Sequence, residues 1–158
     1  MFKKYLIVFL VSMVPLIELR GAIPWSQAYQ LPLLQSYIVC VIGNMLPVPI
    51  IYLFARKVLE WGCDKKYIGK FFIFCIEKGH KGGEKLKKKA GNGLFLALLL
   101  FVGIPLPGTG AWTGTLAASF LDMGFKKSVI AVLFGVLLAG LIMGAVSAGL
   151  FTAIFSFM

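Results

Sequence analysis

The stretch Met13–Pro24, MVPLIELRGAIP, contains the features that decide the fold we predict for this chain. It ends a long apolar run and carries Glu18 and Arg20, two charges separated by one residue. Charged side chains beside a membrane-depth apolar run are costly unless they are paired or hydrated, so they mark a candidate functional site. Gly21 and Pro24 follow, and these residue types form turns or start helices. The stretch therefore predicts a break, with the turn at Leu19–Pro24.

A second stretch, Phe101–Gly114, reads FVGIPLPGTGAWTG and is a partial copy of the first about 90 residues later. Its prolines and glycines exclude a continuous helix. The apolar legs before the two breaks, Tyr5–Ile17 and Gly93–Ile104, are 13 and 12 residues long. At 1.5 Å per residue a leg of that length covers about 20 Å, whereas the hydrocarbon core of a membrane is about 30 Å thick. Each leg is therefore predicted to turn back, together with a short second leg (Trp25–Gln30 and Ala111–Leu121), as a re-entrant hairpin.

Composition places the chain in a membrane. Of its 158 residues, 59% are hydrophobic and only 14% are charged, and Ser128–Met158 contains no charged residue in 31 positions. Ser36–Ala55 is also uncharged, and Pro47 and Pro49 within it predict a kink. About 20 apolar residues suffice to span the hydrocarbon, so both segments are predicted transmembrane helices. We expect an all-α integral membrane protein with one domain over residues 1–158, and no cleaved signal peptide.

Basic residues are concentrated in the middle of the chain. Eleven of the sixteen lysines and arginines lie between Arg56 and Lys89, which accounts for much of the net charge of +10. Such a loop predicts a cytoplasmic location for 56–92 and contact with anionic lipid headgroups rather than nucleic acid. An amphipathic helix lying in the membrane interface is predicted from Ile68, Phe71, Phe72, Cys75 and Ile76, which recur at helical spacing. The only histidine, His80, and the three cysteines show no metal-binding spacing, and no cofactor is expected.

The two halves predict an inverted repeat: residues 1–60, a basic connection at 61–92, and residues 93–158. A hairpin plus one span crosses the membrane an odd number of times, so the second copy is upside down and both termini are expected outside. Lys3 and Lys4 oppose this orientation, but the middle loop outweighs them. Small residues at helical spacing on the last span (Ala131, Gly135, Ala139, Gly140, Gly144, Ala148) predict close helix packing, either inside the molecule or in a homodimer.

The two breaks carry the predicted chemistry. In such hairpins the second legs, near Pro24 and Ala111, point positive helix ends at the same place, which favours an anion. Arg20 suits bidentate contact with phosphate, and Glu18 is the candidate proton carrier. Alternatively, Glu18 and Arg20 pair with each other or with hairpin carbonyls and only stabilise the fold. The predicted substrate- or ion-binding residues are Glu18, Arg20, Gly21, Pro24, Asn44, Pro105, Pro107, Gly108, Thr109, Gly110, Trp112 and Thr113.

The stretches PLIELRGAIP and GIPLPGTGAWTG resemble the signature motifs of the small multidrug export protein family. That family is distantly similar to the DedA and VTT membrane proteins, which have two opposed re-entrant hairpins. The resemblance covers about residues 10 to 150 and implies a multi-pass plasma-membrane transporter. It maps functional positions onto Glu18 and Arg20 and onto Pro105, Pro107, Gly108 and Gly110. DedA proteins also carry charged residues in the second hairpin, and this chain has none there.

Two transport functions follow from these patterns. The first is ion-coupled movement of an anionic lipid phosphate such as undecaprenyl phosphate, which DedA-like relatives are linked to and which Arg20 would bind. The second is export of lipophilic cations, with Glu18 as the embedded carboxylate and aromatic side chains as cation–π partners. A membrane scaffold without transport is a third class. No nucleophile–base pair, metal cluster or phosphate loop is present in the sequence, so no enzyme activity is expected.

Overall fold

The computed structural model describes residues 2–15, 17–63, 93–106 and 108–156, together with the single residues 70, 73, 74 and 77. This part of the chain is helical and contains no β-strand. Its helices are α1 (Phe2–Met13), α2 (Glu18–Ala28), α3 (Leu33–Met45), α4 (Pro47–Cys63), α6 (Gly93–Gly103), α7 (Ala111–Phe120) and α8 (Phe125–Ser156). The all-α prediction is confirmed.

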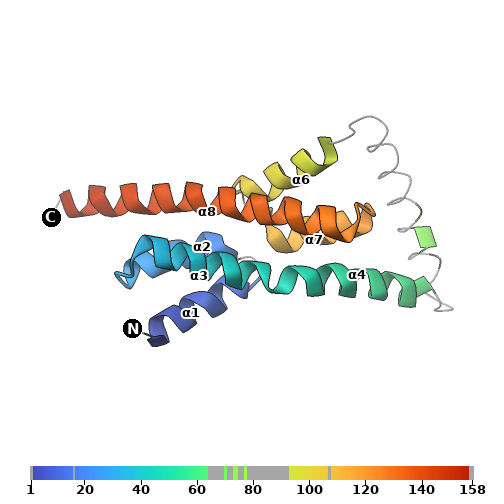
Figure 1. Cartoon of the computed structure of the whole chain (residues 1–158), viewed down its shortest axis with the longest axis horizontal. Helices are drawn as coiled ribbons and strands as arrows, with labels where there is room; N and C mark the ends of the chain where they lie inside the picture. The colour runs from blue at the N-terminus through green and yellow to red at the C-terminus, as the bar shows by residue number, and fades with distance from the viewer. Residues whose placement is uncertain are drawn as a thin grey trace.

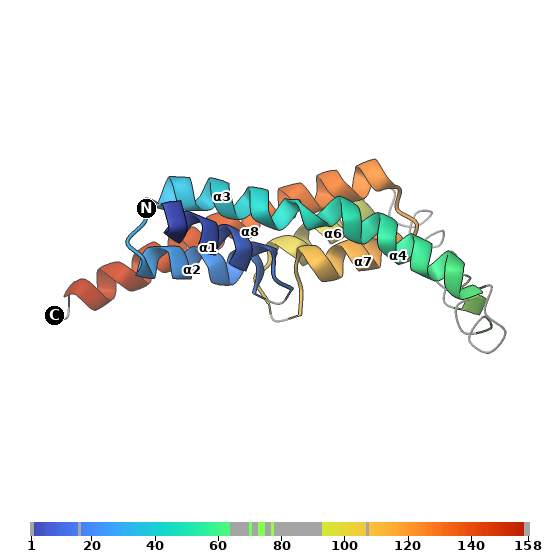
Figure 2. The same cartoon turned by 90° about the horizontal axis from the view of Figure 1, so that it is seen from below.

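The helices form an elongated bundle. Helices α3 and α4 follow each other along its length, and α8 runs back beside them in the opposite direction (Figure 1). Helices α1 and α2 lie in the half that holds both chain termini, whereas α6 and α7 lie in the other half (Figures 1 and 2). We call the end of the bundle that holds both chain termini the terminal end. We call the other end the charged end, because the C-terminal part of α4 and the turn between α7 and α8 lie toward it (Figure 1). These segments and the start of α8 carry Arg56, Lys57, Asp122, Lys126 and Lys127.

The first break lies earlier than the sequence predicted. Helix α1 ends at Met13, two residues before Pro15, and α2 already begins at Glu18. Gly21 and Pro24 therefore lie inside α2, and the predicted turn at Leu19–Pro24 is wrong. A proline inside a helix costs about 3 kcal/mol. The packing of α2 outweighs that cost, because one face of the helix is completely buried (Leu19, Ala22, Ile23 and Ser26).

The second break agrees with the prediction. Helix α6 ends at Gly103 and α7 starts at Ala111, so both short legs lie within one residue of their predicted limits. The predicted kink before Pro47 is also present, because the helix is interrupted at Leu46 between α3 and α4. Helix α4 then continues to Cys63, well past the predicted end at Ala55.

Two helical segments of the described residues are long and apolar enough to cross a membrane. They are Leu33–Cys63, which combines α3 and α4, and Phe125–Gly149 of α8. Their length and composition agree with the predicted transmembrane spans. The predicted interfacial helix over 68–76 and His80 lie almost wholly outside the described residues. The re-entrant hairpins and the inverted repeat stay predictions.

Small residues of α8 pack inside the molecule. A side chain at Gly135 would overlap Val102 and the carbonyl oxygen of Leu99, so α6 lies against α8 at this glycine. A side chain at Gly140 would overlap the ring of Tyr37 from α3. Close approach of helices at small residues is a common form of membrane packing. Internal packing thus accounts for both glycines, and the homodimer stays a prediction.

Candidate functional site

The two helix breaks meet in the middle of the bundle, and Glu18 joins them. Its carboxylate accepts hydrogen bonds from the backbone N–H groups of Ala111 (3.2 Å to Oε2) and Trp112 (3.1 Å to Oε1). These amides open α7 and have no partner within their own helix. A carboxylate at this position also complements the positive end of the helix dipole. Glu18 is only 5% exposed, so this contact is made away from solvent.

Arg20 binds the other side of the same break. Its guanidinium donates hydrogen bonds to three carbonyl oxygens, those of Val102 (2.9 Å), Ile104 (3.2 Å) and Leu106 (2.6 Å). These oxygens lie at and just beyond the C-terminal end of α6, where carbonyl groups lack helical partners. A planar guanidinium with five donors can serve several acceptors at once. Two charges separated by one residue therefore hold both ends of the second break.

Glycine is required where Glu18 approaches the chain. Gly110 has φ +148°, a conformation that residues with a side chain rarely adopt, and a methyl group there would overlap the Glu18 carboxylate. Gly108 also has positive φ, at +81°, but open space surrounds it. The contrast shows that the carboxylate position depends on the absence of a side chain at residue 110.

Further hydrogen bonds fix the breaks relative to each other. The Trp112 indole N–H donates to the carbonyl oxygen of Met13 at 3.2 Å, which ties α7 to the end of α1. The Thr109 hydroxyl lies 3.0 Å from the carbonyl oxygen of Ile104 and 2.9 Å from that of Leu106. The loop between α6 and α7 is thus held by side chains rather than by regular secondary structure.

A cavity of about 360 Å³ lies at this junction. Its volume falls in the range typical of small-molecule sites. Most of its wall is apolar, with one indole, two hydroxyl groups and the Glu18–Arg20 pair among the lining residues. The cavity is lined by Pro15, Glu18, Arg20, Pro105, Leu106, Gly108, Thr109, Trp112, Thr113, Leu116 and Met143.

Most of the predicted site residues come together here. Seven line the cavity: Glu18, Arg20, Pro105, Gly108, Thr109, Trp112 and Thr113. Gly110 lies directly behind the Glu18 carboxylate. Gly21, Pro24 and Asn44 are not among the lining residues. The first two lie within α2, and Asn44 is buried in α3. Pro107 lies outside the described residues.

Sequence reasoning missed four lining residues. Pro15 and Leu106 lie in the two motifs and could have been included on that ground. Leu116 lies about one turn beyond Thr113 on α7, so the helical period could have identified it. Met143 comes from α8, where it is one of many apolar residues, and no pattern distinguishes it.

The contacts of Glu18 and Arg20 match one of the alternatives left open by the sequence. Arg20 binds backbone carbonyl oxygens of the second break, and the anion at the start of α7 is the Glu18 carboxylate. Both residues therefore stabilise the break while they line the cavity. Among the described residues, no group of three or more histidine, cysteine, aspartate or glutamate side chains could hold a metal ion.

Comparison with family models gives a match over residues 18–142, to the family described as putative small multi-drug export protein. The chain belongs to this family. The matched region begins at Glu18, directly after the first break, and contains the second break and most of the residues that line the cavity. The family is described by export rather than by an enzymatic reaction, and together with the two apolar helices it places the chain in a membrane. No curated protein and no solved structure gives a significant match. The similarity to DedA and VTT proteins stays a prediction.

Proposed function

We propose that this chain exports small lipophilic cations, and that the cavity at the two helix breaks is the substrate site. The observation that carries the proposal is the lining of this cavity: apolar side chains, the Trp112 indole and the Glu18 carboxylate. Arg20 also lines it, but its guanidinium is hydrogen-bonded to three carbonyl oxygens. Apolar walls with a few polar groups are typical of sites for organic solutes. An indole and a carboxylate both favour a positive charge. The family description points to the same class of function.

The lipid-phosphate alternative is less well supported by the contacts of Arg20. All three of its hydrogen bonds go to backbone carbonyls, so a phosphate would have to replace some of them. The start of α7, the other expected anion site, already holds Glu18. A lipophilic cation requires neither rearrangement. Coupling to an ion gradient is part of the proposal, with Glu18 as the group in the cavity that can exchange a proton.

We further propose that the two halves form an inverted repeat of re-entrant hairpins. Several local features of the first half recur in the second half 92 residues later, which is the separation between Ser36 and Ser128. The amides of Ser36 and Ser128 both bind the carbonyl four residues earlier at 3.0 Å. The turns before them contain Gln30 and Asp122, with φ of +57° and +51°.

Two packed glycines are related by the same offset of 92 residues, and their carbonyl partners by an offset of 90. Gly43 of α3 lies against the carbonyl oxygen of Phe9 in α1, and Gly135 of α8 lies against that of Leu99 in α6. The helix pairs α1–α2 and α6–α7 approach the middle of the bundle from opposite ends (Figure 1). This arrangement is common in transporters whose substrate site lies near the bilayer midplane.

The orientation we propose places the charged end in the cytoplasm and both termini outside the plasma membrane. Its support is the bias of basic residues toward the connection between α4 and α6. A protease-accessible tag at Met1 and another in the loop 79–83 test it. Cleavage of the two tags from opposite sides of the membrane is expected, and cleavage from the same side would refute the orientation.

An efflux assay tests the proposed function. Proteoliposomes loaded with ethidium or tetraphenylphosphonium are expected to release the cation when an ion gradient is imposed. Leu116→Trp fills part of the cavity, and Ile130→Trp places the same side chain on the exposed surface of α8 as a control. We expect Leu116→Trp to slow efflux about tenfold, the change produced by about 1.4 kcal/mol.

Three outcomes would count against the proposal. Wild-type protein could fail to move either cation, or both tryptophan variants could slow efflux equally. Wild-type protein could instead translocate a polyprenyl phosphate in the same liposomes while the cations stay inside. The third result would replace cation export with the lipid-phosphate function.

A further inference from the structure

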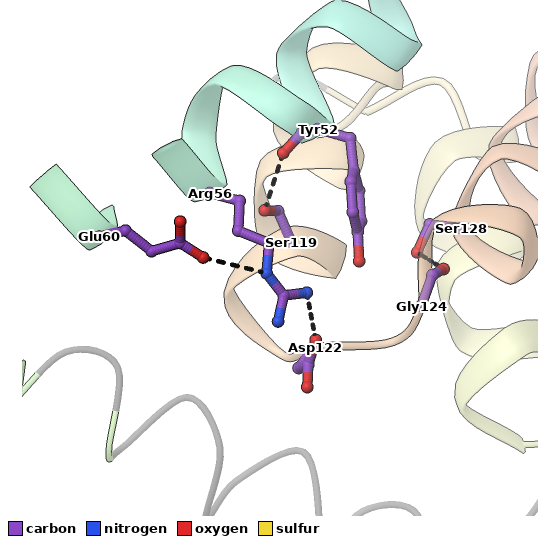
Figure 3. A network of polar contacts seen from close by, with 7 residues as sticks. All are labelled: Tyr52, Arg56, Glu60, Ser119, Asp122, Gly124 and Ser128. Atoms are coloured by element: carbon purple, nitrogen blue, oxygen red, sulfur yellow. Dashed lines mark hydrogen bonds and ion pairs between the residues drawn. The ribbon is translucent and has the colours of Figure 1, made fainter. Parts of the chain in front are cut away.

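The charged end of the bundle is closed by contacts between α4 and the turn that joins α7 to α8. Arg56 of α4 forms an ion pair with Asp122 of the turn, with 2.5 Å between Nη1 and Oδ1 (Figure 3). Arg56 also lies 3.8 Å from Glu60, one helical turn further along α4. Asp122 has φ +51°, a left-handed conformation that aspartate tolerates better than most residues. The turn therefore presents its carboxylate to α4.

Two further contacts between α4 and this region are made by Tyr52, which is buried. The Ser119 hydroxyl, near the end of α7, donates a hydrogen bond to the carbonyl oxygen of Tyr52 at 3.2 Å (Figure 3). The Tyr52 ring packs edge-on against Phe125, the first residue of α8, with 5.5 Å between ring centroids. Residues before, within and after the turn are thus each bound to α4.

Among the described residues, the corresponding positions of the terminal end carry different side chains. At the repeat offset of 92, Tyr52 corresponds to Gly144 and Arg56 to Ala148, both on α8. Phe125 corresponds to Leu33, whose methyl groups lie 3.9 Å from the place of a side chain at Gly144. A hollow of about 480 Å³ occupies this region. It is lined by Leu33, Leu34, Tyr37, Gly140, Leu141, Gly144 and Ala145.

We infer that Arg56 and Asp122 form a gate that keeps the charged end closed in this conformation. The inference rests on the proposed transport function, in which the substrate site opens to one side at a time. The interaction that forms a gate must stabilise the closed state and still break when the protein opens. The two side chains are 42% and 31% exposed, so their ion pair is screened by solvent. Pairs of this kind shift an equilibrium by about fivefold, which corresponds to about 1 kcal/mol.

Access to the cavity from each side tests the gate without any substrate. A reporter cysteine at Thr113, which lines the cavity, is labelled with a membrane-impermeant maleimide in vesicles of known orientation. Cys63 and Cys75 are replaced by serine, whereas Cys40 is fully buried and is retained. In the reporter protein with Arg56 and Asp122 both intact, we expect the cysteine to be labelled mainly from the terminal side.

Asp122→Asn removes the charge but keeps a residue that tolerates positive φ. We expect it to raise labelling from the charged side about fivefold. The control is Glu60→Gln, which removes the longer and more exposed contact of Arg56 and leaves Asp122 in place. Glu60→Gln is expected to leave the labelling rate unchanged. Arg56→Gln should act like Asp122→Asn, and the double variant should add nothing further, because both substitutions break the Arg56–Asp122 ion pair and the Glu60 contact is expected not to affect access.

The gate is refuted if Asp122→Asn and Arg56→Gln leave labelling unchanged, if Glu60→Gln has the same effect, or if the two gate substitutions add. Thermal unfolding of each variant distinguishes an open gate from a loosened fold, since only the second lowers the melting temperature by many degrees. Failure of the cation efflux assay alone would overturn the proposed function. A change in labelling would still show that Arg56 and Asp122 control access to the cavity.

Discussion

Gly110→Ala tests directly how the two helix breaks are held together. Alanine at this position faces two separate costs. The backbone at φ +148° and ψ −174° is strained for any residue with a side chain, at about 1–3 kcal/mol. The new methyl group would also displace the Glu18 carboxylate from the amides of Ala111 and Trp112. Hydrogen bonds to a charged group contribute about 1.5–3 kcal/mol each.

The lower values of these contributions together give a loss of about 4 kcal/mol in the free energy of unfolding. Gly108→Ala is the matched control, because Gly108 also has positive φ but has no atom within 4 Å of the added methyl group. Its cost should be the backbone strain alone, about 1–2 kcal/mol. The difference between the two variants therefore contains the contact with Glu18 and any difference in backbone strain between the two positions.

Denaturant unfolding of purified protein in mixed micelles measures both values. A double-mutant cycle with Glu18→Ala isolates the coupling, since removal of the carboxylate leaves Gly110→Ala with only its backbone strain. We expect a coupling energy of about 3 kcal/mol, the sum of two charge-assisted hydrogen bonds at their lower value. Equal losses for Gly110→Ala and Gly108→Ala, with no coupling to Glu18, would refute the role assigned to the carboxylate.

Three further predictions concern stability. Arg20→Lys should lower the free energy of unfolding by about 2 kcal/mol, because a compact ammonium group cannot reach three carbonyls. As a control, Arg56→Lys, at a half-exposed ion pair, should change the free energy of unfolding by less than about 0.5 kcal/mol in the same assay. Ser128→Ala removes a hydrogen bond to Gly124 and should cost about 1 kcal/mol, whereas Ser36→Ala should cost nothing, since the Ser36 hydroxyl is buried without a partner among the described residues. A reversed order would contradict both assignments. Gly135→Ala should cost about 1–3 kcal/mol through overlap with α6, whereas Gly149→Ala, in open space, should not lower the free energy of unfolding, because alanine favours a helix more than glycine does.

Much of the fold was predictable because membrane segments obey simple length rules. The limits of α6 and α7 followed from a run of prolines and glycines that no helix tolerates. Pro24 was harder to interpret. By local rules it should start or end a helix, but the buried face of α2 keeps the helix intact across it. The position of the first break was therefore decided by packing that the sequence does not display.

The candidate site also has a part that the sequence predicts and a part that it does not. Glu18 and Arg20 stood out because charge is costly beside apolar membrane segments. Their partners could not be predicted, since these are backbone groups more than 80 residues away, and backbone groups carry no residue-specific signal. Met143 and Leu116 line the cavity for a comparable reason: an apolar side chain can face lipid or a cavity with the same sequence pattern.

Sequence alone determined that the chain is helical, belongs in a membrane and breaks twice, because hydropathy and backbone stereochemistry act locally. Only the tertiary structure decided what the two charges do. It placed Glu18 on the start of α7 and Arg20 on the end of α6, so that each charge meets the oppositely charged end of a broken helix. Such contacts depend on how distant segments pack, and packing is a property of the assembled helices rather than of any one stretch.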